Sequence, residues 1–257
     1  MEEPLGYSEQ ALTRFGSRLV RLWDRDGFDV EDAVGTARLL TLLLRQQGMD
    51  SPAAAQLLVD TGIRDRWNKV FAEGRSAVAA EWIAPHLGTP WLDVLAGDFT
   101  LTRGLARIGG QPAVAVERRS AYQTDWAGLD FPVIDLDELG GLRGQAFDTA
   151  FLGTVLHHER DFGPLLEQLA ALDCRRWLVA ENCLDAENDE EFHLLVDEFF
   201  NRCLNTFDVP CVPQHRTREG WMAALSEYGT VTHVGQRAAM PGIPFPYDLF
   251  LVERTAR

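Results

Sequence analysis

The sequence has little cysteine, no run of basic residues and no long apolar segment. Its four cysteines, Cys174, Cys183, Cys203 and Cys211, form no Cys-x-x-Cys pair, so we expect reduced, mostly buried thiols and no disulfide framework. No uninterrupted apolar run approaches the ~18 residues of a membrane span. The N-terminus, MEEPLGYSEQ, is acidic and lacks the apolar region of a signal peptide, which favours a cytoplasmic location.

The chain is strongly acidic. It carries 24 Lys and Arg against 39 Asp and Glu, a formal net charge of −15. This charge opposes binding to a phosphate backbone, so we expect no nucleic-acid partner, and a neutral or cationic small molecule is accommodated more easily. With 257 residues, 46% of them hydrophobic, the chain is long enough for one large α/β domain and a smaller appendage.

Residues 1–88 are predicted to form an N-terminal helical cap of four helices. In the first helix, apolar residues from Leu12 to Trp23 recur at helical spacing. In the second, over 30–48, the residues from Leu39 to Leu44 are apolar nearly all round, which predicts a helix buried among others. Ser51 and Pro52 mark the start of the third, as a cap and a first helical residue. The fourth is predicted to carry Trp67 on its apolar side.

Residues 89–257 are predicted to form an α/β domain. Short apolar runs at 91–95, 112–117, 131–135, 147–153 and 176–182 alternate with helical or loop segments. This alternation favours a parallel sheet with helices on both faces. The runs at 229–237 and 247–254 have no helix between them and predict a hairpin at the edge of the sheet.

Three acidic residues lie where a ligand site of a parallel sheet needs them, beyond the carboxyl ends of the strands. Asp93 is in the first strand, Glu117 ends the second, 20 residues after Gly97, and Asp135 ends the third. An acid at the second position can accept hydrogen bonds from both ribose hydroxyls, and one at the third can accept from an adenine amino group.

The run from Trp91 to Arg254 resembles the class I S-adenosylmethionine-dependent methyltransferases. The resemblance is carried by LDVLAGDFTLTRGLA, Glu117, Asp135, FDTAFLGTVLHHERD, RRWLVAEN and HRTREGWMAALSEYG. It implies a Rossmann-like seven-stranded sheet whose last strand is antiparallel, with S-adenosyl-L-methionine as cofactor. The cofactor-binding residues that it implies are Arg75, Asp93, Gly97, Glu117, Asp135, Gly153 and Thr154. Of these, Arg75 would meet the cofactor carboxylate or would simply be an exposed helix residue.

The sequence departs from the family at the turn after the first strand, where glycines are expected at the positions of Leu95, Gly97 and Phe99. Glycine there permits a positive φ and a close approach to the ligand. Strain of about 1–3 kcal/mol at Leu95 would weaken binding by roughly one to two decades if it fell only on the bound state. The Phe99 ring would either fill the pocket or pack beneath the next helix. Because Gly97 is kept, we expect cofactor binding to be retained.

Two residues are candidates for catalysis. His158, preferred over the adjacent His157, can remove a proton from an acceptor, although the histidine pair also occurs in the family as a scaffold feature. Glu181, at the end of the fifth strand, would either orient or deprotonate the acceptor or cap the next element. The run HHERD lacks the i, i+4 histidine pair of a helical zinc motif, so no metal site is expected.

The acceptor pocket is expected between the helical cap and a lid. Residues 192–217 resemble an insertion that covers the acceptor in some of these enzymes, with Asn201, His215 and Arg216 as its polar candidates. The aromatic residues Phe199, Phe200 and Phe207 are expected to be core of this lid.

Three functions are consistent with this sequence. The first is methyl transfer from S-adenosylmethionine to a small-molecule acceptor. The second is a cyclase or lyase reaction on the same cofactor, in which its own amine displaces methylthioadenosine. The third is a catalytically inactive, methyltransferase-like partner protein, suggested by Leu95 and Phe99. The sequence leaves open the acceptor and whether the chain is a monomer or a homodimer.

Overall fold

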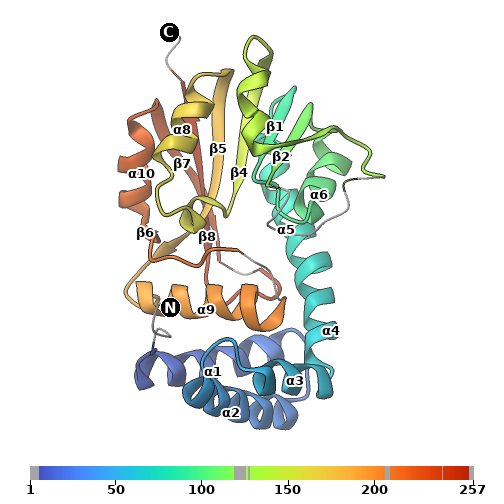
Figure 1. Ribbon diagram of the computed structural model, residues 1–257, viewed down its shortest axis with the longest axis vertical. Helices are drawn as coiled ribbons and strands as arrows, with labels where there is room; N and C mark the ends of the chain where they lie inside the picture. Colours follow the sequence, from blue (N-terminus) through green and yellow to red (C-terminus); the bar gives the residue numbers. More distant parts are fainter. Residues whose placement is uncertain (1–5, 119–125, 127, 206–208, 239, 255–257) are drawn as a thin grey trace.

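The computed structural model describes residues 6–118, 126, 128–205, 209–238 and 240–254. Helices gather at one end of the molecule, and a sheet with further helices forms the other end (Figure 1). The helices near the N-terminus are α1 (Glu9–Arg25), α2 (Val30–Gln47), α3 (Pro52–Asp60), α4 (Ile63–Lys69) and α5 (Ser76–Ile83). A π-helical turn, Val70–Arg75, joins α4 to α5. The predicted fourth helix is therefore one helical segment with a π turn in its middle.

Local chemistry sets the helix starts that the sequence predicted. The Ser51 hydroxyl accepts a hydrogen bond from the Ala54 N–H at 3.1 Å, and Pro52 is the first residue of α3. Ser8 caps α1 in the same way. Since such caps satisfy backbone N–H groups that have no partner within the helix, they fix where each helix begins.

The prediction that the second helix is buried on all sides is wrong. In α2, Leu39 is 45% exposed and Leu42 is 44% exposed. The helix packs on α1 and α3 through one side, which contains Ala37, Leu40 and Leu44, and its other side faces outward. Apolar composition alone does not distinguish a central helix from an outer one.

The sheet has seven strands along its path and confirms the predicted fold class. The strands are β1 (Trp91–Val94), β2 (Val114–Glu117), β3 (Val133–Asp135), β4 (Ala146–Gly153), β5 (Asp173–Leu184), β7 (Thr230–Arg237) and β8 (Tyr247–Glu253). Their order is β3-β2-β1-β4-β5-β8-β7, and the short β6 (Arg216–Thr217) pairs with β5 off this path. The pairs from β3 to β5 are parallel, whereas β8 is antiparallel to both β5 and β7.

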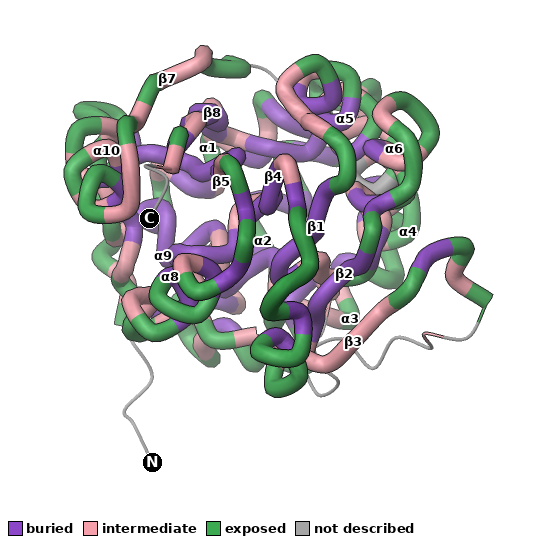
Figure 2. The backbone as a smooth tube through the Cα atoms, turned by 90° about the horizontal axis from the view of Figure 1, so that it is seen from above, coloured by how far each residue is buried: buried purple, intermediate pink, exposed green. Residues whose placement is uncertain are grey.

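Helices cover both faces of the sheet. Figure 2, which looks along the strands, shows α5 and α6 (Thr100–Gly109) on one side and α8 (Gly163–Ala170) and α10 (Arg218–Ser226) on the other. Each face has its own apolar core: Phe151 and Leu178 pack with α5 and α6, while Leu152 and Val179 pack with α8 and α10. Alternate residues of one strand thus point to opposite cores.

A cluster of aromatic side chains joins the N-terminal helices to α9 (Glu190–Glu198) and the π turn that follows it, Phe199–Leu204. The aromatic cluster consists of Phe15, Trp23, Trp67, Phe199 and Phe200, with neighbouring ring centroids 5.0–5.8 Å apart. Phe199 is fully buried, which confirms its predicted place in a core; Phe207 lies outside the described residues. The cluster holds α9 between the N-terminal helices and the sheet (Figure 1).

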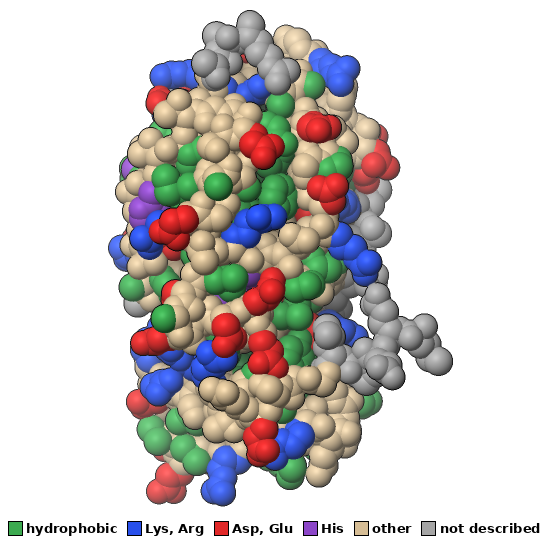
Figure 3. All heavy atoms as spheres, turned by 90° about the vertical axis from the view of Figure 1, so that its left-hand side faces the viewer, with side chains coloured by type: hydrophobic (Ala, Val, Ile, Leu, Met, Phe, Trp, Pro, Cys, Tyr) green, Lys and Arg blue, Asp and Glu red, His purple; other side chains and the backbone are tan. Residues whose placement is uncertain are grey.

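The cysteines and the helix lengths agree with what the sequence predicts. All four cysteines are free thiols, and Cys174, Cys183 and Cys203 are buried. Among the described residues, no helix is both long and apolar enough to cross a membrane. On the face that Figure 3 shows, acidic and basic side chains are interspersed.

Candidate active site

A cavity of about 150 Å³, partly open to solvent, lies beyond the carboxyl ends of β1, β4 and β5. The predicted site residues that line it are Arg75, Asp93, Gly97, Gly153, Thr154, His158 and Asn201. The sheet supplies one wall, and α9 with its π turn supplies another through Asp197, Phe200 and Asn201. The first π turn contributes Arg75, so both π turns reach the cavity, in keeping with the tendency of π turns to occur at functional sites.

The turn after β1 has the geometry of the glycine-rich turn although two of its glycine positions are filled. The φ angles are 57° at Leu95, 65° at Gly97 and 62° at Phe99. The chain's own hydrogen bonds hold this shape: the Ala96 N–H donates to the Val116 carbonyl at 3.1 Å, and the Phe99 N–H to the Ala96 carbonyl at 3.2 Å. The turn therefore has the positive φ at Leu95 without a ligand. The strain lowers the stability of the folded protein more than it lowers ligand affinity.

The Phe99 ring packs away from the cavity. It is fully buried, with ring centroids 6.1 Å from Phe131 and 6.5 Å from Trp126, and belongs to a small core with Ala115. Phe99 is not among the residues that line the cavity, and the residues it packs with belong to β2 and the segment before β3 and not to the next helix, α6. The side chain at this glycine position thus leaves the cavity open.

Buried carboxylates support the turn. The Thr102 hydroxyl donates to Asp93 Oδ2 at 2.7 Å, and burial raises the pKa of Asp93 to about 7 despite that hydrogen bond. The Glu117 carboxylate accepts from the N–H of Gly97 and of Arg118, both at 2.6 Å. Burial raises the pKa of Glu117 to about 7 as well, against these two hydrogen bonds. Asp135 is paired with Glu117 across β2 and β3, so two of the predicted acids are neighbours.

His157 forms a buried pair with Glu181. Its Nδ1 lies 2.7 Å from Glu181 Oε2, and Glu181 Oε1 accepts from the Leu156 N–H at 2.8 Å. A carboxylate at Nδ1 favours the tautomer with the proton on Nδ1, which leaves the Nε2 lone pair available on the cavity side. Burial lowers the pKa of His157, but the Glu181 charge, the hydrogen bond to Glu181 and the Asp197 charge together raise it more, so the net pKa is above its ordinary value.

His158 is held by the chain around Pro210. Its Nδ1 donates to the Pro210 carbonyl at 2.9 Å, since a carbonyl can only accept. Burial holds the pKa of His158 below its ordinary value, although Asp197 nearby acts in the opposite direction. Adjacent in sequence, the two histidines are thus fixed by partners from different parts of the fold.

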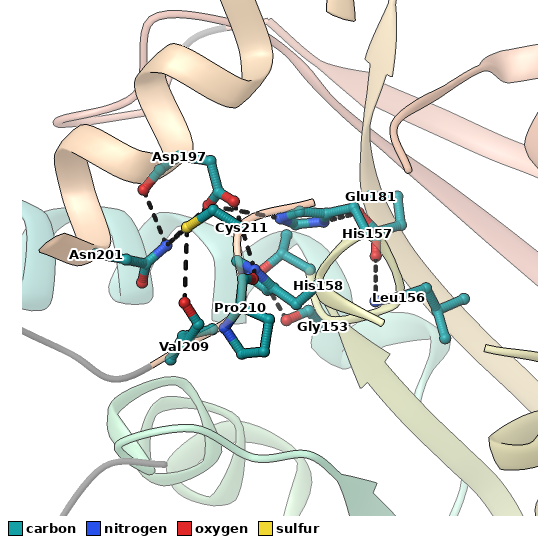
Figure 4. Close-up of polar contacts among 11 residues, drawn as sticks. Gly153, Leu156, His157, His158, Glu181, Asp197, Asn201, Val209, Pro210 and Cys211 are labelled. Atoms are coloured by element: carbon teal, nitrogen blue, oxygen red, sulfur yellow. Dashed lines mark hydrogen bonds and ion pairs between the residues drawn. The ribbon is translucent and has the colours of Figure 1, made fainter. Parts of the chain in front are cut away.

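Asp197 completes a cluster with both histidines (Figure 4). One of its oxygens lies 3.9 Å from His157 Nε2 and the other 3.5 Å from His158 Nδ1. Asn201 Nδ2 donates to Asp197 Oδ1 at 2.8 Å and orients the carboxylate. One donor atom from each of His157, His158 and Asp197 lies within 4.8 Å of the other two, a separation that would allow them to share a metal ion. This three-residue group is called the HHD cluster below.

Five predicted residues do not line the cavity among the described residues: Glu117, Asp135, Glu181, His215 and Arg216. Glu181 is fully buried behind His157. His215 is buried with its ring stacked on His157, the centroids 4.7 Å apart. The Arg216 guanidinium lies over the rings of Phe162 and Trp221. His215 and Glu181 therefore support the histidine that the cavity meets, whereas Arg216 lies elsewhere.

The sequence interpretation missed Asp197, although a signal was present. His193, Asp197 and Asn201 recur every four residues in a segment whose other residues, apart from Glu198, are apolar, which places polar groups on one side of a helix. The cavity-lining residues Asn182 and Tyr247 were also missed. They belong to two strands that pair only in the folded sheet, and the sequence carries no signal of their proximity.

Comparison with solved structures places this architecture. No family model matches the sequence, and no curated protein is similar to it. The CurJ carbon methyltransferase aligns with a TM-score of 0.52 and 14% identity over 98% of this chain and 82% of that chain. Magnesium protoporphyrin IX methyltransferase from Synechocystis PCC 6803 gives 0.47 and 14% over 79% and 99%. Mitomycin 7-O-methyltransferase MmcR gives 0.46 and 15% over 95% and 96%.

The chain has the fold of the class I S-adenosylmethionine-dependent methyltransferases, as the resemblance in sequence predicted. The likeness to the CurJ carbon methyltransferase, which spans nearly the whole chain, and the strand order with antiparallel β8 agree on this point. At 14% identity the likeness defines the fold alone.

Proposed function

We propose that this protein transfers a methyl group from S-adenosyl-L-methionine to a small-molecule acceptor. One observation carries the proposal: a single cavity connects the turn at the carboxyl end of β1 with the HHD cluster. The turn offers a place for the methyl donor, and the cluster offers polar groups for an acceptor. Because α9 lies across the ends of the strands, we expect the acceptor to be small enough to fit between them.

The residues of the turn fit the cofactor. A carboxylate has about four lone-pair positions, and Glu117 uses two of them for the Gly97 and Arg118 N–H groups. Because Glu117 is buried and outside the lining of the cavity, its side chain would have to turn toward the cavity to accept from ribose hydroxyls. Asp135, beside it, would accept from the adenine amino group. Arg75 lines the cavity near the Tyr247 hydroxyl and would meet the cofactor carboxylate. Gly153 and Thr154 would lie beside the sulfonium.

When bound, S-adenosylmethionine supplies an electrophilic methyl group on a good leaving group. The task left to the protein is to hold the acceptor in line, since orientation accounts for much of the acceleration in such reactions. An acceptor held in the cavity would have to lose a proton on methylation, and His157 and His158, which line the cavity, would be the bases available to it. In this proposal His158 contacts the acceptor, and Glu181 is a positioning residue that acts through His157.

Calorimetric titration with S-adenosylmethionine tests the proposal. We expect Glu117→Gln to weaken binding by roughly 10- to 150-fold, because charge-assisted hydrogen bonds contribute about 1.5–3 kcal/mol. The matched control is Glu227→Gln, an exposed residue after α10, and should bind like the unchanged protein. If millimolar cofactor does not bind, the proposal is wrong and the inactive partner protein is favoured.

Product analysis of the same mixtures separates the two reactions. S-adenosylhomocysteine that appears only on addition of an acceptor indicates methyl transfer. Methylthioadenosine released without any acceptor would instead support the cyclase or lyase. Both products are measurable by chromatography, and the Glu117→Gln protein should form either one more slowly at limiting cofactor.

A further inference from the structure

We propose that the HHD cluster is a binding site for a first-row divalent transition-metal ion such as Zn²⁺ or Fe²⁺. The site itself is independent of the proposed methyl transfer; its role in activating the acceptor rests on that function. The proposal corrects the expectation from the sequence. That expectation looked for a histidine pair on one helix, whereas the structure brings Asp197 from α9 to two consecutive histidines.

The donor atoms are near the spacing that an ion requires. Nitrogen and oxygen ligands lie about 2.0–2.2 Å from a tetrahedral zinc ion, so two of them are roughly 3.3–3.6 Å apart. The three donor atoms of the HHD cluster lie within 4.8 Å of one another. The widest separation therefore has to close by up to roughly 1.5 Å, through rotation of these side chains, to complete the site.

Each of the three side chains is oriented by a partner behind it. His157 is held by the Glu181 carboxylate at 2.7 Å, and His158 by the Pro210 carbonyl at 2.9 Å. Metal-binding histidines almost always donate their other ring N–H to a carboxylate or a backbone carbonyl. His157 fits this pattern, because it meets Asp197 through Nε2, whereas His158 meets both Pro210 and Asp197 through Nδ1 and would have to bind the ion through Nε2. Asn201 holds Asp197, at 2.8 Å. This set of partners is our strongest reason to propose a metal site.

Charge also favours a cation at this point. Glu181 is fully buried and the Asp197 side chain is 10% exposed, and both carboxylates flank His157. Buried charges are costly unless they are paired. A divalent cation between His157, His158 and Asp197 would balance both carboxylates.

The donor set selects the class of ion. Two imidazoles and one carboxylate suit zinc and iron, whereas Mg²⁺ and Ca²⁺ prefer oxygen ligands. Three protein ligands on the wall of a cavity leave coordination positions for another molecule. We infer that an acceptor oxygen occupies one of them, and that its hydroxyl proton is released to water because a metal lowers the pKa of a bound hydroxyl.

Metal content and binding of the full chain test the site. We expect about one equivalent of metal per chain after purification, by mass spectrometry. The chelator-treated protein should bind one equivalent of Zn²⁺ by calorimetry, be stabilised against heat by it, and not respond to Mg²⁺. Co²⁺ should give visible absorption bands of a nitrogen- and oxygen-coordinated ion. Glu181→Gln should weaken Zn²⁺ binding by roughly 10- to 100-fold, and Asp197→Asn and His158→Gln should weaken it more.

His233→Gln is the matched control, because His233 also contacts a carboxylate, Asp248 at 2.7 Å, but does so on the β7–β8 hairpin. It should bind Zn²⁺ like the unchanged protein. Circular dichroism confirms that each variant is folded. Zn²⁺ binding that survives both Asp197→Asn and His158→Gln is adventitious and would overturn the proposal, as would absence of binding to the unchanged protein.

The cofactor titration of the metal-free protein keeps the two proposals apart. Metal binding without S-adenosylmethionine binding would support the site and contradict the proposed function. Cofactor binding and methyl transfer by a protein that binds no metal would support the proposed function and contradict the metal site. The histidines would then act as bases.

Discussion

Leu95, Phe99 and Thr154 are the only described residues other than glycine with positive φ, and all three are at the carboxyl ends of β1 and β4. Leu95 and Thr154 line the cavity itself. Strained residues of this kind persist where the surrounding structure determines them, and they gather at functional sites. For Thr154, the N–H donates to the Ala180 carbonyl at 2.7 Å, which ties the strained backbone to the next strand.

Substitution of Leu95 separates backbone strain from side-chain packing. Leu95→Ala and Leu95→Gly both remove a buried side chain, but only glycine also relieves the positive φ. We therefore expect Leu95→Ala to be less stable than Leu95→Gly by about 1 kcal/mol, with both less stable than the unchanged protein. Urea unfolding measures this order; an alanine variant as stable as the glycine variant would show that Leu95 is unstrained. Cofactor affinity should change by no more than about one decade.

Asp93 makes stability depend on pH. Burial raises its pKa from 3.8 to about 7, so the folded protein binds this proton more tightly than the unfolded chain does. The free energy of unfolding then decreases as pH rises from about 4 to about 7, by roughly 1.4 kcal/mol per unit of separation between the two pKa values. Asp93→Asn keeps a side-chain oxygen that can accept from the Thr102 hydroxyl, but it removes the negative charge.

We expect Asp93→Asn to match the unchanged protein near pH 4 and to be more stable at pH 8, by urea unfolding at both values. Asp173→Asn, at an exposed position of β5, is the control and should show no such divergence. If Asp93→Asn and the unchanged protein were equally stable at pH 8, the buried charged carboxylate would not lower the free energy of unfolding.

At the scale of elements, α9 and its π turn pack into a core on one side and line the cavity on another. One side contributes Phe199 to the aromatic cluster, and another contributes Asp197 and Asn201 to the cavity. The segment predicted to be a lid is thus packed against the N-terminal helices through aromatic side chains, which positions Asp197. The helices from α1 to α5 and α9 share one continuous apolar core with one face of the sheet.

Loss of Phe199 should loosen this attachment. Phe199→Ala removes a fully buried ring, and such truncations typically lower the free energy of unfolding by about 3–5 kcal/mol. Leu39→Ala is the control, since Leu39 is 45% exposed on α2 and should cost little. Thermal and urea unfolding measure the stability of both variants. Similar losses of stability in the two would contradict the role of Phe199 in holding α9 to the N-terminal helices.

At the scale of the whole molecule, the site is assembled from distant parts of one acidic chain. The HHD cluster and its partners come from positions 157 to 210, and Arg75 comes from the N-terminal region. They meet because the carboxyl ends of parallel strands share one edge of the sheet, and because α9 crosses that edge. The net charge of −15 agrees with a neutral or cationic acceptor, which remains part of the proposal.

The sequence by itself determined the strands, the antiparallel end of the sheet and the acids at the strand ends, because period, capping and spacing act locally. Gly97, Glu117 and Asp135 follow from such spacing. Only the tertiary structure decided that the Phe99 ring leaves the cavity open, that α2 is an outer helix, and that Asp197 meets His157 and His158. Each of these depends on which surfaces pack together, and packing joins residues whose distance along the chain carries no local signal.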